Sequence, residues 1–207
     1  MHIVRTNRPR LHLKDSVICS RDAGAATPLV VDGGLARLCL YLPDGQRVVA
    51  GFAFAGEVVG LAQPQPSMVV EAVTTTWTHE WSNGDDAVAI DEAQMLSAAL
   101  SRAMAVLAMR SRHHAHARLA AFLVDLIDRG FGTSFALPIA RSDIGDHLGL
   151  TVHTVSRILS DFKRCGLIDA GPSRILSFDR IALQAVADQG GQLPHLASID
   201  ALPGMVH

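Results

Sequence analysis

The chain has 207 residues, of which 49% are hydrophobic and 18% are charged. It can therefore form one large domain or two small ones with a sizeable core, and it is not a polar, charge-rich disordered protein. Its formal net charge of −2 gives no global reason to expect nucleic-acid binding, and charged residues interrupt its apolar stretches before the roughly 18–20 residues that a membrane span needs.

The N-terminal residues and the cysteines bear on location and redox chemistry. The first 20 residues contain several basic side chains and no apolar segment of the secretory type, so we expect a cytoplasmic protein without a membrane partner. The cysteines Cys19, Cys39 and Cys165 are far apart and odd in number, which argues against a disulfide framework. Without a Cys-x-x-C pair, neither a zinc ribbon nor a cysteine-held cluster is supported, and we expect no cofactor.

Residues 29 to 81 have the pattern of an antiparallel β-structure. Short apolar runs at 29–32, 35–42, 47–55, 58–61 and 68–76 are separated by turn signals such as Gly33-Gly34 and Pro43-Asp44-Gly45. Strands at this spacing predict a small sandwich or roll, in which Cys39 is a core residue.

Beyond residue 86 the pattern becomes helical. In a predicted long helix over 91–113, apolar residues recur at the spacings of a helix–helix seam: Leu96, Leu100, Ala103 and Leu107. The spacing leaves open whether this seam joins two chains or packs on the helix's own β-domain. A second helix is expected over 115–129, with Gly130 as its C-cap, and a loop or short strand over 131–137. From residue 191 we expect a loosely held tail.

Residues 138–168 carry the most informative motif. Ile144 and Leu148 lie four apart on a short helix, which Gly149 can end in the left-handed conformation. Thr151 is a good N-cap for a second helix, which Gly166 ends. The predicted buried face of that helix consists of Val155, Ile158, Leu159 and Phe162. Two short helices joined by a tight glycine turn form a helix-turn-helix.

The segment that follows predicts a wing. Residues 167–178 have the pattern of strand, turn and strand, and Asp179 can cap a last helix over 181–188.

One face of the second helix is expected to be exposed near its start, and it comprises Val152, His153, Ser156 and Arg157. In helix-turn-helix proteins these positions reach base edges in the major groove, and an arginine can bind guanine through two hydrogen bonds. Thr151 and Thr154 are candidates for phosphate contacts. The alternative is a helical hairpin of an enzyme or of an interaction module, although the sequence contains no catalytic motif.

The segment 143–157, Asp-Ile-Gly-Asp-His-Leu-Gly-Leu-Thr-Val-His-Thr-Val-Ser-Arg, resembles the DNA-binding signature of the Crp/Fnr superfamily, most closely its Fnr/FixK branch. Residues 34–38, 43–47 and 51–60 resemble the β-roll sensor of that family. The resemblance implies an α+β chain with an N-terminal double-stranded β-roll of the cupin-like, cyclic-nucleotide-binding type (1–90), a dimerisation helix (91–113) and a winged helix-turn-helix (114–190).

The resemblance also implies partners. The chain would form a homodimer along its long helix and bind near-palindromic double-stranded DNA, and RNA polymerase would be a further partner of an activator. Arg141 and Ser142 stand where the family touches phosphates, whereas Ala140 replaces the usual capping residue.

The sequence departs from the family in its reading helix and its sensor. His153 stands where the branch usually has glutamate, so we expect a variant of the TTGA-type half-site, or a phosphate contact by His153. Gly56-Glu57 resembles the ribose-binding pair of the cAMP-dependent branch, but residues 61–73 contain no arginine for the cyclic phosphate. We therefore expect no cAMP binding and interpret Glu57 as a turn residue. Cys19 stands alone where the iron–sulfur branch has a cluster, and only 28 residues precede Leu29, which predicts a shortened roll.

Two weaker candidates support an alternative function. His113 and His116 are three residues apart and could share a metal or haem, or simply form a polar helix junction. Cys165, at the end of the reading helix, could sense oxidants or be structural. The alternative is a haem-, metal- or redox-responsive sensor whose helical domain mediates protein contacts.

Overall fold

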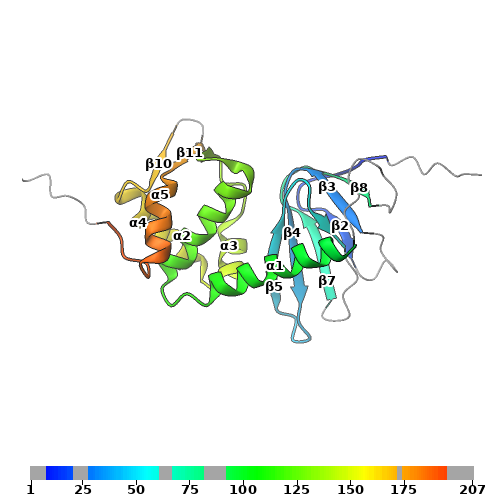
Figure 1. Cartoon of the computed structure of the whole chain (residues 1–207), viewed down its shortest axis with the longest axis horizontal. Coiled ribbons are helices and arrows are strands. Elements are labelled where there is room, and N and C mark those ends of the chain that lie inside the picture. Colours follow the sequence, from blue (N-terminus) through cyan, green and yellow to red (C-terminus); the bar gives the residue numbers. More distant parts are fainter. Residues whose placement is uncertain (1–7, 21–27, 61–66, 82–91, 172–173, 195–207) are drawn as a thin grey trace, which may run out of the picture. The chain divides into compact units, whose positions relative to one another are not determined.

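The computed structural model describes residues 8–20, 28–60, 67–81, 92–171 and 174–194. The chain forms two compact units. The first contains residues up to 111 together with 138–152, and the second contains 112–137 together with residues from 153 onward. Figure 1 labels the helices and strands along the chain. No helix in these described ranges is long and apolar enough to cross a membrane. The predicted tail lies almost wholly outside them.

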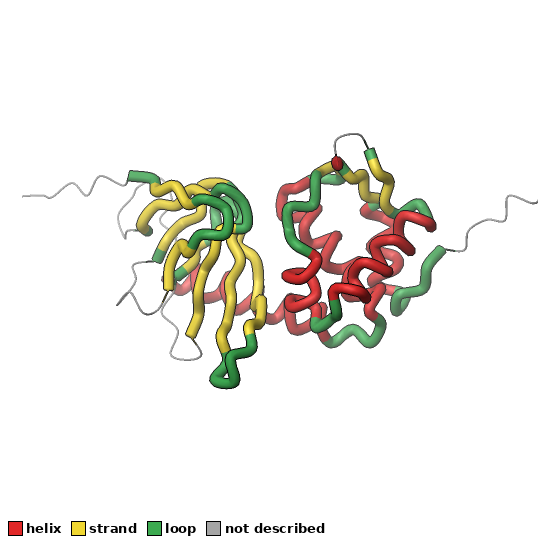
Figure 2. Tube along the Cα trace, turned by 180° about the vertical axis from the view of Figure 1, so that it is seen from behind, coloured by secondary structure: helices red, strands yellow, loops and turns green. Residues whose placement is uncertain are grey.

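The first unit is built on a β-roll of two antiparallel sheets (Figure 2). One sheet has the strand order β1-β8-β3-β6, and the other has the order β2-β7-β4-β5. The strands of the first sheet are β1 (Arg10–His12), β8 (Thr76–Glu80), β3 (Leu29–Gly33) and β6 (Val58–Val59). Those of the second are β2 (Val17–Ser20), β7 (Ser67–Ala72), β4 (Ala36–Tyr41) and β5 (Arg47–Ala53).

The core of the roll lies between the two sheets because both contribute inward-facing apolar residues. Its central cluster is Leu29, Val31, Ala36, Ala53, Val59 and Val70. Cys39 is fully buried on β4, as predicted.

The roll has more strands than the sequence pattern indicated. β1 and β2 precede Leu29 and are short and partly exposed, so they lack the apolar alternation that marks a half-buried strand. The run 68–76 is not one strand, because a bend over 73–75 separates β7 from β8. The buried Thr76 hydroxyl, at the start of β8, donates to the Leu35 carbonyl (3.1 Å), which satisfies a buried polar group directly after this bend.

Helix α1 (Glu92–Arg110) has two apolar faces. On one face, Met95 and Met109 are buried. Helix α1 also contacts strand β5 of the roll. The other face is exposed and contains Leu96, Leu100, Ala103, Met104 and Leu107, which we call the α1 stripe. Its four large residues are each more than half exposed.

The second unit is mainly helical, with α2 (Ala115–Leu126), the π-helical turn η2 (Ile127–Phe131), α4 (Val152–Arg164) and α5 (Arg180–Asp188). The strands β9 (Ser134–Phe135), β10 (Ile168–Ala170) and β11 (Leu176–Phe178) form an antiparallel sheet with the order β10-β11-β9. α2 packs on α5, and its predicted apolar face, comprising Leu119, Phe122, Leu123 and Leu126, is buried.

The end of α2 differs from the prediction. Gly130, expected as the C-cap, lies inside the turn η2 at φ 116°, and Gly132 is the residue that ends the segment. The chain thus adds a wider turn before it leaves the helix, a change of helix type that apolar periodicity does not reveal.

Candidate nucleic-acid interface

The helix α4 separates an apolar face from a polar one. Val155, Ile158, Leu159 and Phe162 are buried, as their spacing predicted. On the other side Val152, His153 and Arg157 are exposed, and Ser156 is half-buried. The helix ends before Gly166, which has φ 72°, where the Leu167 amide donates to the Phe162 carbonyl (2.9 Å). The candidate reading residues therefore project from a helix whose opposite face is fixed in the core.

Helix α3 (Arg141–Leu148) and the turn after it match the predicted helix-turn-helix pattern. Gly149 adopts the left-handed conformation at φ 66° and ψ 43°, and two more residues lead into α4. The Leu150 amide donates to the Gly145 carbonyl (2.9 Å). A Cβ atom on Gly145 would lie 2.6 Å from the Leu150 carbonyl oxygen, so this turn requires glycine at position 145.

The candidate phosphate-binding residues lie at the starts of α3 and α4. Arg141 and Ser142 are exposed in the first turn of α3, and Thr151 is exposed just before α4, whereas Thr154 is half-buried. Ala140 is the N-cap of α3 and provides no side-chain hydrogen bond, as the sequence indicated. The N-terminus of α3 therefore lacks a cap from the side chain at position 140.

Two arginines of the roll bind two aspartates of α3, and we call these four residues the roll–α3 clamp. Arg37 donates to Asp143 (2.7 Å), and Arg47 donates to both Asp143 (2.7 Å) and Asp146 (2.8 Å). Burial opposes the charge on Arg47, but its hydrogen bonds to Asp146 and Asp143 outweigh that effect and raise its pKa. The guanidinium groups therefore remain charged.

The wing is confirmed as an antiparallel pair of strands, β10 and β11, with residues 172–173 outside the described part of the chain. β9 adds a third strand, and the rings of Phe135 and Phe178 stack at 4.6 Å between centroids. The Asp179 carboxylate caps α5 by accepting from the Ala182 amide (2.9 Å).

Among the described residues, neither of the histidines expected at a helix junction belongs to a group of three or more His, Cys, Asp or Glu side chains that could hold a metal ion. His113 is exposed, whereas His116 is half-buried and lies 3.1 Å from Asp161 of α4, between Nε2 and Oδ2. The hydrogen bond with His116 lowers the pKa of Asp161, and the nearby Arg164 adds to the effect. His116 therefore links α2 to α4 through a polar contact.

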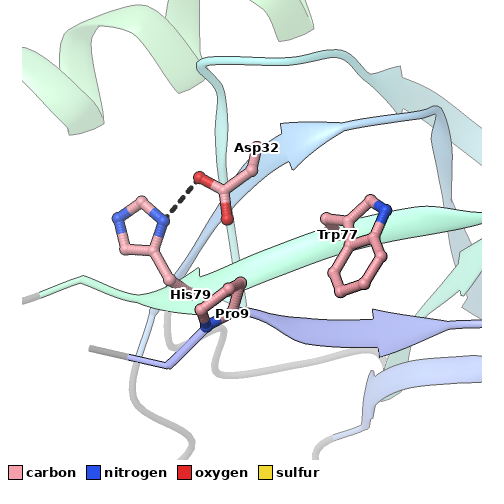
Figure 3. A pocket seen from close by; sticks show the side chains of 4 residues that line it. All are labelled: Pro9, Asp32, Trp77 and His79. Carbon is pink, nitrogen blue, oxygen red and sulfur yellow. Dashed lines mark hydrogen bonds and ion pairs between the residues drawn. The ribbon is translucent and has the colours of Figure 1, made fainter. Parts of the chain in front are cut away.

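The roll carries a shallow depression of about 420 Å³ on the sheet that contains β8 (Figure 3). Pro9, Asp32, Trp77 and His79 line it, and His79 Nδ1 lies 2.6 Å from Asp32 Oδ1. None of these four residues carries a permanent positive charge, so they do not provide the cation that a bound phosphate requires.

Glu57 is a turn residue, as interpreted from the sequence. Its carboxylate accepts from the Phe54 amide (3.1 Å) and lies 3.9 Å from the Arg102 guanidinium. It stabilises the turn between β5 and β6, in which Gly56 has φ 86°.

Sequence reasoning missed the roll–α3 clamp and the role of Gly145. The clamp joins residues about 100 positions apart, and no local pattern marks such pairs. A signal for Gly145 did exist, because a glycine inside a short helix costs about 1 kcal/mol relative to alanine and calls for a packing reason.

Comparisons with known proteins agree with this arrangement. Residues 117–186 match the Crp-like helix-turn-helix domain. The chain is 36% identical over 149 residues to the nitrogen fixation regulation protein FixK of Rhizobium meliloti, a match that covers 70% of this chain and 71% of that protein. It is 30% identical over 205 residues to the transcriptional activator protein FnrA of Stutzerimonas stutzeri, covering 89% of this chain and 82% of that one.

Solved structures match over most of the chain. The structure of FixK2 from Bradyrhizobium japonicum matches with a TM-score of 0.71 and 30% identity, and the match covers 86% of this chain and 96% of that one. TTHB099, a CRP-family transcriptional regulator from Thermus thermophilus, has the same fold with a TM-score of 0.71 at 24% identity.

Proposed function

Because the chain belongs to the Crp/Fnr family of transcription regulators and carries its helix-turn-helix DNA-binding domain, we propose that it binds a near-palindromic operator as a homodimer, without cAMP and without an iron–sulfur cluster. The observation that carries this proposal is the exposed start of α4, where His153 and Arg157 project from a helix fixed by its buried face. These residues read base edges in the major groove.

Arg157 binds a guanine through its O6 and N7 atoms, a contact worth about 1–3 kcal/mol of discrimination against other bases. His153 stands beside it and replaces the glutamate of the related regulators, so the half-site differs from the TTGA type at the base pair that His153 faces. Arg141, Ser142, Thr151 and Thr154 contact phosphates and set the register of the protein on the duplex.

The α1 stripe supports the homodimer. Its residues Leu96, Leu100, Ala103 and Leu107 follow the seam spacing, and Met104 widens the apolar face. The opposite side of the same helix carries Met95 and Met109, which are already buried. A second copy of α1 covers the stripe, and burying each large side chain contributes about 1.5–3 kcal/mol. Two recognition helices then lie about 34 Å apart, one helical turn of DNA.

The side chains of the roll support independence from cAMP and from an iron–sulfur cluster. Glu57 is engaged in its own turn, and residues 61–73 contain no arginine. Cys19 and Cys39 lie on strands that are separated by β7, about 10 Å apart at ordinary strand spacing. Burial raises the pKa of both thiols to about 11, which disfavours the thiolate that iron requires.

Selection of random duplex DNA by the purified protein, with reduced thiols and no added nucleotide, tests the proposal. We expect a two-fold palindrome that contains guanine at the position Arg157 reads, and an affinity that falls steeply as salt increases. The Arg157→Ala variant, selected in parallel, should lose the guanine preference but still form dimers. Adding cAMP should leave the affinity unchanged, and the protein purified without oxygen should contain no iron. Failure to enrich any sequence at low salt would contradict the proposal.

A further inference from the structure

We propose that Arg37 and Arg47 of the β-roll are positioning residues for DNA binding, because the roll–α3 clamp fixes the first helix of the helix-turn-helix and neutralises its carboxylates. This inference rests on the proposed function. It assigns to the roll a direct role in operator affinity that requires no bound effector.

The clamp is a continuous network across the sheet. Arg37 also donates to Glu71 on the neighbouring strand β7 (2.7 Å), and its partner Asp143 accepts from Arg47 as well. Arg47 continues to Asp146, one turn further along α3. The side chain of Asp143 is only 3% exposed. A carboxylate at that depth is stable only when it is paired, so the position of α3 depends on both arginines.

A second set of contacts holds the same face of α3. His147 Nδ1 lies 3.1 Å from the Val49 carbonyl oxygen of β5, and its ring packs edge-on against Phe52 at 5.2 Å between centroids. His147 is buried, and it follows Asp143 and Asp146 on the side of α3 that faces β5. α3 is therefore fixed to the roll by polar and aromatic contacts together.

The charges explain why this matters for DNA. The exposed residues of the first turn of α3, Arg141 and Ser142, precede Asp143 directly. In helix-turn-helix proteins the first helix crosses the DNA backbone. Unpaired carboxylates on that helix would repel the phosphates, whereas in the clamp each of the two carboxylates is paired with a guanidinium group of the roll. A closed clamp therefore favours binding.

The experiment compares Arg47→Glu with Arg10→Glu. Arg10 forms an exposed ion pair with Glu80 on the other sheet of the roll, so its reversal changes the net charge equally without touching α3. Fluorescence anisotropy with the selected operator measures affinity, and amide hydrogen exchange of α3 in the DNA-free protein measures docking. We expect about a tenfold or greater loss of affinity and faster exchange in α3 for Arg47→Glu, with Arg10→Glu close to the wild type.

Exchanging the charges of Arg47 and Asp146 distinguishes a loss of α3 positioning from a general loss of folding. Arg47→Glu combined with Asp146→Arg should restore most of the affinity, and circular dichroism should confirm that each variant is folded. Equal affinities of Arg47→Glu and Arg10→Glu, or tighter binding by Arg47→Glu, would overturn the inference while the wild type still binds its operator. A wild type that binds no duplex would instead refute the proposed function, and this inference with it.

Discussion

Replacing Gly145 by alanine should destabilise the turn between α3 and α4. The new Cβ atom would lie 2.6 Å from the Leu150 carbonyl oxygen, and the backbone must move by about 0.4 Å before the contact becomes tolerable. The same movement weakens the hydrogen bond from the Leu150 amide to the Gly145 carbonyl. Overpacking costs about 1–3 kcal/mol and the weakened bond about 1 kcal/mol, against about 1 kcal/mol gained in helix propensity.

The expected net loss in the free energy of unfolding is thus about 1–3 kcal/mol, which lowers the thermal midpoint by about 2–12 °C. Urea unfolding followed by circular dichroism measures it. Gly33→Ala is the matched control, because a Cβ atom there meets nothing within 4 Å. Operator affinity of Gly145→Ala should fall as well. A Gly145→Ala variant as stable as Gly33→Ala would refute the reasoning.

Three further predictions concern the dimer, the half-site and acid stability. Leu100→Glu places a charge in the α1 stripe, so sedimentation should show monomers, while the roll remains folded because Leu100 is exposed. His153→Glu should move the selected half-site toward the TTGA type at one base pair only, and selection from random DNA detects this; an unchanged half-site would mean that position 153 does not read a base. The pKa of Asp161 is lowered in the folded protein, chiefly by its hydrogen bond with His116. At pH values above its unfolded pKa of about 3.9 this carboxylate therefore stabilises the fold, and that contribution is lost as the pH falls below this value. Asp161→Asn should therefore be less stable than the wild type at neutral pH and should lose less stability on acidification, as urea unfolding between pH 7 and 3 would show.

Local patterns sufficed for the helical elements of the interface. The buried face of α4 follows the helical period. Gly149 ends α3 in the left-handed conformation, and Asp179 caps the N-terminus of α5. Such features depend on residues within four positions of one another, which is why one sequence is enough to predict them.

The features that were not predicted depend on distant partners. β1 pairs with β8 across more than sixty residues, and its exposed residues show no alternation. Arg37 and Asp143 gave no sign of pairing, since each is an ordinary polar residue in its own segment. The turn η2 also escaped prediction, because Gly130 fits a simple helix end equally well by local criteria.

The packing of α3 with the roll bears on how this protein can be divided. A fragment that begins near residue 112 would contain the complete helix-turn-helix sequence, yet it would expose the face of α3 on which Asp143 and His147 are now buried. Such a fragment should be less soluble and bind DNA more weakly than the whole chain. Chimaeras that join this reading helix to a foreign sensor should work only when the new sensor supplies basic residues where Arg37 and Arg47 stand. The chain therefore cannot be cut at the start of the DNA-binding domain without removing the contacts that hold α3 to the roll.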